Sequence, residues 1–487
     1  MKSYQTTQVV SQVRFDNGLT WGWSVLFLLL SIQWQPFSLK MPLFYLFIAQ
    51  FIFSVLHQIL FTILTRKNYQ TEQKNRMVGI LSLILLFGIF VGNIFTFISG
   101  IITLKKSEST AFIYSIYMVL VDVLVISVTA MNFFKPFVAD RFLTMMYILI
   151  LSLLFHTFIL LFGKKWYGWN KNIKRIFLFL LVLSSLTGNI LALFVADSYY
   201  QDDKPGAKGK RQTSIREKLI RNQAALLGLL FITFLVTISI TSNWSFSQSF
   251  SQSNNYSVIL QKPSLMYPFG TDNFGRDVFS RIIFGAQISL SVGLLATGIP
   301  LLIGGTLGAI SGYYGSHTDN VIMRLLDVLY AIPGMLLAIT IVAAFGASTT
   351  NLIIALSLGA IPSYARTMRA NVLQVANYEY VEAARALGQD NWSIIRKHVV
   401  PNSLAPMIVR ATLTIGTAVI STSSLSYLGL GVEAHIPEWG NILRIGSKYL
   451  ETNPYLAIYP GLAIILLVLS FNFLGDGVRD ATDPRFN

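Results

Sequence analysis

The segment YVEAARALGQDNWSIIRKHVVP, residues 380–401, lies between two long apolar runs near the C-terminal end of the chain. Its residues favour helix except at Gly388, where a left-handed conformation can end a first short helix. Asn377 can cap the start of that helix, and Asp390 can cap the start of a second one. Pro401 cannot continue a helical ladder of hydrogen bonds and marks the end of the second helix. The sequence therefore predicts a compact, charged helical hairpin between two apolar segments.

Both helices of this hairpin carry residues that suit contact with another protein. Three alanines give the first helix a smooth side that a second backbone can approach closely, and three larger residues give the second helix apolar anchors. They are Ala383, Ala384 and Ala386 in the first helix, and Trp392, Ile394 and Ile395 in the second. We therefore expect the hairpin to insert into a partner.

The composition around the hairpin is that of an integral membrane protein. Of 487 residues, 53% are hydrophobic and 12% are charged. Apolar residues form blocks of about twenty, the length of a helix that crosses a bilayer. Only helices and closed barrels satisfy their backbone groups in lipid, and the sequence has no alternating barrel pattern. The expected fold is therefore all-α.

The formal net charge of +15 does not indicate a nucleic-acid-binding protein, because Lys and Arg cluster between apolar runs, where membrane topology places them. The chain has no cysteine, which excludes disulfides and thiolate sites. Its five histidines lack the spacing of metal ligands, so we expect no metal site. No short apolar segment with a small-residue cleavage site follows the N-terminus, so we expect no removable signal peptide.

The apolar blocks predict about 12 membrane spans, six on each side of a basic stretch, residues 201–223, that is typical of a cytoplasmic linker. The predicted domains are residues 1–200, a helical membrane domain of unknown role, and residues 224–487, a second membrane domain. The expected spans are near residues 19–37, 41–64, 77–102, 111–131, 142–163 and 176–197 before the linker, and 224–242, 288–311, 320–345, 350–365, 405–428 and 455–475 after it.

Charge gives a consistent orientation for the second domain but not for the first. Counting outward from a cytoplasmic linker places residues 243–287, with a charge balance of +1, outside the cell, and the hairpin and the C-terminus inside. In the first domain the same count places residues 65–76 inside but residues 163–175, with five basic residues, outside. Either one predicted span is wrong, or the positive-inside bias is overridden locally.

The segment GTDNFGRD, residues 270–277, combines two turn glycines with two carboxylates and an arginine. Two carboxylates are too few for a calcium site, so we expect local ion pairs. The segment leads into residues 278–286, an amphipathic stretch that we expect to lie in the outer interface of the membrane. The external-loop residues of interest are Gly270, Asp272, Gly275, Arg276 and Asp277.

Charged residues also occur near the start of the predicted span at residues 320–345. Asn320, Arg324 and Asp327 fall on one helical face. We expect an Arg324–Asp327 ion pair that is structural or faces a partner, with a role in a pathway through the membrane as the alternative. Asp319 is off that face and can cap the start of the helix.

The hairpin also carries a family signature. EAARALG followed by a proline at the thirteenth place after the glycine resembles the signature of the membrane subunits of bacterial ATP-binding-cassette (ABC) importers. Further segments resemble the C-type subunit of the dipeptide/oligopeptide/nickel permease subfamily, in the same order, over about residues 212–487. They are RNQAALLG (221–228), YPFGTDNFGRDVFSRIIFGAQISLSVG (267–293), YLGLG (427–431), PEWG (437–440), YPG (459–461) and GDGVRDATDPR (475–485). Residues 1–200 resemble no family.

This resemblance implies a type I importer fold for the six C-terminal spans and makes the hairpin, residues 377–401, a coupling loop that seats in a cytoplasmic ATPase. The residues that match the family signature are Glu382, Ala383, Ala384, Gly388 and Pro401. The implied partners are a second permease subunit that forms a heterodimer with this chain, two ABC ATPase subunits and an extracytoplasmic substrate-binding protein. The chain is expected to be a multi-pass protein of the cytoplasmic membrane, in contact with lipid.

No cofactor is expected on the chain itself. The stretch GAKGKR, residues 206–211, lacks the spacing and the Gly-Lys-Ser/Thr ending of a phosphate loop. ATP and Mg are therefore expected on the partner ATPase subunits, and the chain is not expected to be an enzyme.

The resemblance implies import of di- or oligopeptides, with nickel or another small solute as the alternative, and it indicates no substrate-binding residues. A gradient-driven transporter would need ionisable groups or broken helices near the middle of the membrane, and the predicted spans of the second half show almost none. A membrane sensor or scaffold is favoured only by the unexplained residues 1–200.

Overall fold

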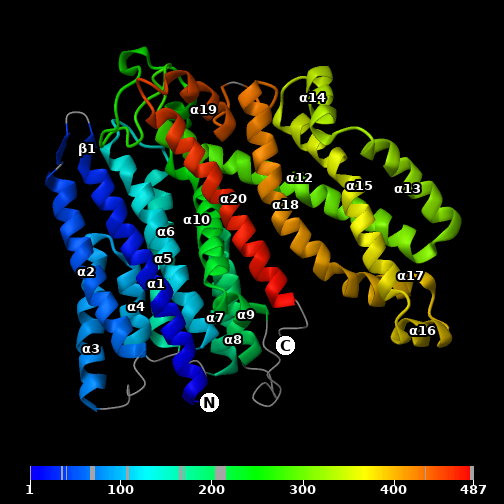
Figure 1. Ribbon diagram of the computed structural model, residues 1–487, viewed down its shortest axis with the longest axis horizontal. Helices are drawn as coiled ribbons and strands as arrows, with labels where there is room; N and C mark the ends of the chain where they lie inside the picture. The colour runs from blue at the N-terminus through cyan, green and yellow to red at the C-terminus, as the bar shows by residue number, and fades with distance from the viewer. Residues whose placement is uncertain are drawn as a thin grey trace. The chain divides into compact units, whose positions relative to one another are not determined.

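The computed structural model describes residues 2–34, 37–39, 41–65, 72–105, 109–163, 168, 170–202, 215–433 and 435–482. Helices dominate these residues (Figure 1). A short antiparallel hairpin, in which β1 (Ile32–Trp34) pairs with β2 (Phe37–Leu39), follows the first helix. Seven described helices are long and apolar enough to cross a membrane, or eight if one bent pair counts as a span. The predicted all-α membrane fold is confirmed.

Contacts divide the chain into two compact units. Unit 1 comprises residues 1–120, 155–182 and 191–210, and unit 2 comprises residues 121–154, 183–190 and 211–487. Unit 2 therefore includes parts of the chain that precede the basic stretch at residues 201–223. The domain boundary at that stretch stays a prediction, and residues 203–214 within it lie outside the described part of the chain.

Unit 1 is a set of helices whose facing surfaces carry polar side chains. Its helices are α1 (Lys2–Ser31), α2 (Met41–Thr65), α3 (Glu72–Leu86), α4 (Ile94–Lys105), the first part of α5 (Thr110–Ala130), the end of α6 (Phe142–Phe162), α7 (Lys171–Ser184) and α8 (Leu191–Asp202). α1 packs along α2, where Asn17 Nδ2 donates to Gln58 Oε1 at 2.6 Å and the Ser24 and Ser54 hydroxyls lie 2.7 Å apart. Such hydrogen bonds hold helices together in lipid.

Two predicted spans are divided at a glycine. Residues 77–102 form α3, the 3₁₀ helix η1 (Phe87–Val91) and α4, with Gly92 at a φ of 76°. Residues 176–197 form α7, the 3₁₀ helix η4 (Ser185–Thr187) and α8, with Gly188 at a φ of 99°. Glycine adopts this left-handed conformation without steric cost, so each glycine ends one helix and lets the chain turn. The prediction of one continuous span is therefore wrong at both places.

Unit 2 contains the rest of α5, η2 (Met131–Phe134), the start of α6 and the described helices from residue 215 onward. These are α9 (Ile215–Arg221), α10 (Gln223–Ser245), α11 (Gln248–Gln252), η5 (Tyr256–Val258), α12 (Val278–Tyr314), α13 (Ser316–Tyr330), α14 (Gly334–Phe345), α15 (Thr349–Val375), α16 (Glu379–Ala386), α17 (Asn391–Ile394), the π-turn η6 (Ile395–Val399), α18 (Val400–Leu428), α19 (Trp439–Gly446), η7 (Ser447–Tyr449) and α20 (Tyr455–Thr482). α12 packs along α15 and α18, and α20 packs along α10 and α18 (Figure 1).

α12 is one continuous helix of 37 residues. The predicted interfacial segment at residues 278–286 is therefore wrong, because these residues form the buried first turns of the helix. Farther along, α12 approaches α15 closely: a Cβ at Gly304 would lie 2.6 Å from the Ile361 carbonyl oxygen, and one at Gly308 would clash with the Ala365 carbonyl oxygen. Glycines spaced by four residues let two helices meet at their backbones, which is how membrane helices associate tightly.

The predicted span at residues 320–345 is bent. α13 and α14 meet at an angle of 75° across a short break that ends at Pro333. Proline lacks the backbone N–H that a continuous helix needs, so the break occurs there.

Candidate functional site

The predicted hairpin is present as α16, a turn at Gly388, α17 and the π-turn η6. Gly388 has a φ of 79°, the left-handed conformation expected of it. The Asp390 carboxylate accepts a hydrogen bond from the Ser393 backbone N–H at 2.9 Å, which confirms it as the cap of α17.

Two other expectations for the hairpin are wrong. The residue that caps α16 is Tyr378, and the Asn377 side chain donates instead to the Leu373 carbonyl at the end of α15. Pro401 does not end a helix but lies in the first turn of α18. At this position the backbone N–H that proline lacks would have no hydrogen-bond partner within the helix. The π-turn before it joins α17 to α18, so the second arm of the hairpin continues into the span.

One side of the hairpin is anchored in the core of unit 2. The side chains that anchor it are Val381, Ala384, Ile394 and Val399, and they pack with Tyr364, Met368, Val372 and Met407 of α15 and α18. Tyr313, at the end of α12, donates its hydroxyl hydrogen bond to Asn391 Oδ1 at 2.9 Å. The hairpin is therefore anchored on the ends of three long helices, α12, α15 and α18.

The other side of the hairpin is exposed. Leu387 is 82% exposed and Trp392 is 56% exposed, whereas Ile394 and Ile395, also expected as anchors for a partner, are buried within the chain. Of the residues that match the family signature, Ala384 is buried and the others are exposed: Glu382, Ala383, Gly388 and Pro401. The tip thus combines exposed apolar and charged side chains, which suits a docking surface.

Ion pairs between α13 and α15 differ from the prediction. Asp327 accepts from Arg366 Nη2 at 2.6 Å, so the expected Arg324–Asp327 pair is not formed. Asp319 accepts from Arg369 Nε at 2.6 Å and Nη2 at 2.5 Å and does not cap α13. Both acids of α13 therefore pair with arginines of α15, and Arg369 binds Asp319 through two donors, the bidentate geometry that guanidinium groups favour.

The residues predicted to lie in an external loop form one buried turn. Gly270 and Gly275 have φ values of 74° and 72°, and Thr271 forms a bridge with Asp277. Asp272 Oδ2 accepts from Arg276 Nε at 2.8 Å, which confirms the local ion pair. A Cβ at Gly275 would clash with the Asn255 carbonyl oxygen, so only glycine is compatible with this packing.

Asp277 has two further roles that the sequence did not indicate. Its carboxylate caps α12 by accepting from the Phe279 and Ser280 backbone N–H groups. It also accepts from Lys135 Nζ at 2.6 Å, and both side chains are buried, at 1% and 0% exposure. Lys135 follows η2 and precedes α6, so a residue from before the basic stretch completes this turn of unit 2.

The PEWG segment, residues 437–440, packs against the first turns of α12 in unit 2. Trp439 is fully buried, and its Nε1 donates to the Ile282 carbonyl oxygen of α12 at 2.9 Å. Glu438 is fully buried and caps α19 by accepting from the Asn441 N–H at 3.1 Å. Burial raises the pKa of the Glu438 carboxyl above its ordinary value, although hydrogen bonds from Gly440, Asn441 and Ser423 oppose the shift.

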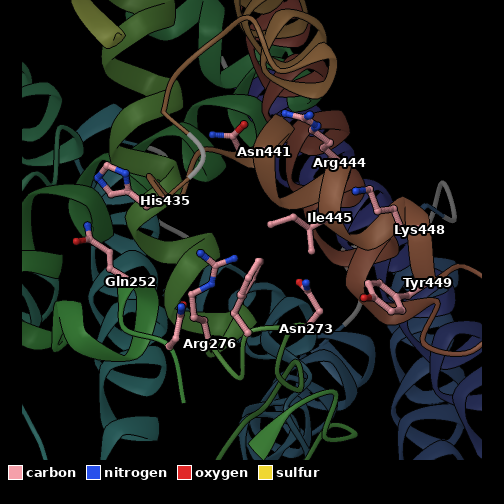
Figure 2. A pocket seen from close by; sticks show the side chains of 11 residues that line it. Gln252, Asn273, Arg276, His435, Asn441, Arg444, Ile445, Lys448 and Tyr449 are labelled. Carbon is pink, nitrogen blue, oxygen red and sulfur yellow. The ribbon is translucent and has the colours of Figure 1, made fainter. Parts of the chain in front are cut away.

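A cavity of about 540 Å³ opens between the turn at residues 270–277 and α19. Figure 2 shows Arg276 on one side of it and Arg444 and Lys448 on the other. Its lining is polar and cationic, and consists of Gln252, Asn254, Asn273, Phe274, Arg276, His435, Asn441, Arg444, Ile445, Lys448 and Tyr449. The volume is in the range of small-ligand sites.

Arg410 is a charged residue that the sequence analysis overlooked. It lies within α18, and its guanidinium donates to the Ser363 and Thr367 hydroxyls of α15. It lines a second hollow of about 440 Å³ together with Arg366 and Tyr330. Among the described residues, no group of three or more His, Asp or Glu side chains could hold a metal ion.

Comparison with known proteins identifies the family. Residues 304–487 match the family described as binding-protein-dependent transport system inner membrane component. The dipeptide transport system permease protein DppC of Alkalihalophilus pseudofirmus is 44% identical over 269 residues, which are 55% of this chain and 88% of that protein. The chain belongs to this family of ABC importer permeases. The resemblance predicted from the motifs is therefore confirmed.

A second curated relative agrees with this assignment. The glutathione transport system permease protein GsiD of Pectobacterium atrosepticum is 39% identical over 268 residues, which are 55% of this chain and 89% of that protein. A structure of the MetNI methionine ABC transporter in an inward-facing conformation matches 42% of this chain and 97% of that chain, at 20% identity and a TM-score of 0.35. The curated relatives are transport permeases, and this chain is a multi-pass protein of the inner membrane.

Proposed function

We propose that this chain is the membrane-spanning permease subunit of an ABC importer for di- or oligopeptides. The observation that carries the proposal is the 44% identity to a dipeptide permease over 88% of that protein's length. The second relative is named for glutathione, which is itself a tripeptide. The six C-terminal spans would adopt the type I importer fold and form the translocation path.

The hairpin is proposed to couple this path to ATP hydrolysis on separate ATPase subunits. Its anchored side joins α12, α15 and α18, and its exposed side offers Leu387, Trp392 and Glu382 to a partner. An ATPase that moves the tip would therefore move three spans together. ATP and Mg would be held by those subunits and not by this chain.

The proposed assembly contains this chain, a second permease subunit, two cytoplasmic ATPases and an extracytoplasmic substrate-binding protein. The binding protein would meet the external turn and α19. In this arrangement the hairpin and the C-terminus are cytoplasmic and residues 246–277 are extracytoplasmic, as the distribution of basic residues favours.

Nickel remains the alternative substrate, and the external cavity favours peptides over it. Arg276, Arg444 and Lys448 line that cavity without an acidic side chain, so the local potential repels a divalent cation.

Uptake of a radiolabelled dipeptide tests the proposal in cells that lack other peptide permeases and produce this chain with its partner subunits. We expect uptake that depends on the binding protein and is lost in the Glu382→Lys variant, because the reversed charge lies on the docking surface. Asp140→Lys, a charge reversal at an exposed acid outside the hairpin, is the matched control and should transport normally. Nickel uptake without peptide uptake would contradict the proposed substrate.

A further inference from the structure

The external cavity of unit 2 has the chemistry of a carboxylate site. Three of its lining side chains are cationic at neutral pH, four are amides, and none is acidic. Arg444 and Lys448 are exposed, and neither forms an ion pair with another described residue. Guanidinium and ammonium groups beside amide donors are the usual partners of a carboxylate.

A buried cation points to a ligand more directly. Arg276 is 4% exposed, and its Nε donates a hydrogen bond to Asp272. Its Nη2 is also buried but has no hydrogen-bond partner among the described residues. Leaving a buried guanidinium donor unpaired is costly, so such a group is usually matched by a ligand or partner. Figure 2 shows its guanidinium directed toward the space that Asn273, Arg444 and Lys448 surround.

We propose that this cavity binds a carboxylate, supplied either by the C-terminus of the peptide substrate or by an acidic side chain of the binding protein. The inference rests on the proposed function and adds a recognition chemistry to it. Arg276 would hold the carboxylate at the inner wall of the cavity, and Arg444 and Lys448 would draw it in from the aqueous side. The site would accept a peptide or an acidic surface and repel a metal cation.

The test uses the double variant Arg444→Gln/Lys448→Gln, whose exposed side chains contribute little to folding. Lys262→Gln is the matched control, because Lys262 is an exposed cation of the same external segment outside the cavity. Uptake is measured for a peptide with a free C-terminus and for its C-terminal amide, chosen so that the binding protein holds both equally. Affinity of the unloaded binding protein for the permease in nanodiscs is measured in parallel.

If the peptide supplies the carboxylate, the KM for the free peptide rises about tenfold in the double variant and that for the amide does not change. If the binding protein supplies it, its affinity falls about tenfold and both peptides are affected equally. Unchanged KM values and unchanged affinity would overturn the site. Absence of peptide uptake by the unaltered importer would instead contradict the proposed function, and the nanodisc measurement would still test the cavity.

A different observation concerns residues 2–202, which contain two copies of one arrangement. His57 precedes Arg76 by 19 residues, and His156 precedes Arg175 by 19 residues. Each arginine is the fifth residue of a helix, which is followed by a 3₁₀ turn, a left-handed glycine and the sequence Asn-Ile where a second helix begins. The asparagines have equivalent bonds: Asn93 Nδ2 donates to Gln50 Oε1 at 2.8 Å, and Asn189 Nδ2 donates to Asp122 Oδ1 at 2.9 Å.

Each copy ends in a helical hairpin, in which the second helix runs back alongside the first. In the first hairpin a Cβ at Gly100 would lie 2.8 Å from the Ser82 carbonyl oxygen, so α3 and α4 lie side by side. In the second, the rings of Phe177 and Tyr199, each 11 residues from Gly188, lie 6.1 Å apart. α4 and α8 have 12 residues each, about 18 Å of helix, which is too short for a hydrocarbon core of about 30 Å.

Both tips lie beside the middle of a spanning helix. Asn93 contacts Gln50, which is well inside α2, and a Cβ at Gly188 would lie 2.7 Å from the Thr237 Cα of α10. Non-helical backbone at this depth is tolerated where protein covers it, as it does here.

We infer that residues 2–202 are a tandem repeat of two spans and one re-entrant hairpin, and that both hairpins open to the cytoplasm. This arrangement places the basic loops at residues 65–76 and 163–175 on one side, which removes the charge conflict. It also places Lys135 on the same side as Asp277, which their contact requires. Six simple spans would put Lys135 and Asp277 on opposite sides of the membrane.

Single cysteines test this arrangement, because the chain has none of its own. The exposed positions are Thr65, Ser109, Asn170 and, in the external segment, Ser264. With an impermeant thiol reagent on intact cells, the Ser264→Cys variant should label, and the other three should label only after permeabilisation. Labelling of Ser109→Cys or Asn170→Cys on the same side as Ser264→Cys would overturn the repeat, and either variant alone decides the outcome.

Discussion

Lys135 Nζ lies 2.6 Å from Asp277 Oδ2, and both side chains are almost completely buried. The pair joins the loop after η2 to the capping residue of α12, which are 142 residues apart in the chain. Phe137 stacks on Phe250 beside it, with ring centroids 4.5 Å apart. Part of the region before the basic stretch is therefore built into the permease unit.

Loss of the Lys135 ammonium is expected to destabilise unit 2. Lys135→Ala leaves the Asp277 carboxylate buried without its cation, which typically costs about 3–5 kcal/mol. We expect a lower midpoint of thermal unfolding in detergent, and Lys262→Ala, an exposed lysine, should have no effect. The double variant Lys135→Met/Asp277→Asn should recover much of the loss, because it leaves no buried charge. Equal unfolding midpoints for Lys135→Ala and the unaltered protein would contradict the role of this pair.

The segment 205–487 expressed alone should be less stable than the full chain for the same reason. It retains every span after the basic stretch but lacks Lys135 and Phe137. We expect a lower unfolding midpoint and weaker assembly with partner subunits, measured by copurification. If the segment matches the full chain in both measurements, residues 121–154 are dispensable for unit 2.

Gly388 should tolerate few substitutions. Its φ of 79° is outside the range of proline, so Gly388→Pro must distort the turn between α16 and α17. We expect the variant to reach the membrane in normal amounts but to lose peptide uptake. Gly388→Asn, whose side chain tolerates the left-handed conformation, should retain most of the uptake. The opposite ranking of the two variants would show that the turn geometry is unimportant.

Glu438 predicts a pH dependence of stability. Because burial raises its pKa, the folded protein binds this proton more tightly than the unfolded chain does. The contribution to stability is complete below the ordinary glutamate value of about 4.3 and is lost as pH rises through the folded pKa. Acidification from pH 7.5 to 5 should therefore raise the unfolding midpoint more in the unaltered protein than in Glu438→Gln. Glu451→Gln, at an exposed position, should behave like the unaltered protein, and identical pH profiles for all three would refute the shift.

Local signals in the sequence predicted local structure well. Gly388 and Asp390 have the predicted conformation and cap because each depends on neighbours within a few residues. Asn377 and Pro401 were misassigned because their roles depend on how α15 and α18 continue beyond the hairpin.

The partners of charged residues, and the depth to which each helix enters the membrane, could not be predicted in the same way. Hydrophobicity does not distinguish a spanning helix from a hairpin, so the turns at Gly92 and Gly188 were overlooked. The partner of Asp327 is Arg366 on another helix, and that of Asp277 is Lys135 in another part of the chain. Such pairs depend on how helices pack against one another, and the spacing of residues along one helix gives no information about that packing.

The exposed side of the hairpin is proposed to bind the ATPase that drives transport. The most direct measurement is copurification of the ATPase subunits with affinity-tagged chain, comparing the unaltered protein with Leu387→Asp/Trp392→Asp. Both side chains are exposed apolar groups of the tip, and replacing them with carboxylates should remove their contact without disturbing the anchored side. We predict that the ATPase copurifies with the unaltered chain and is reduced at least tenfold in the double variant, with equal amounts of chain in the membrane. Undiminished copurification with the double variant would contradict the account.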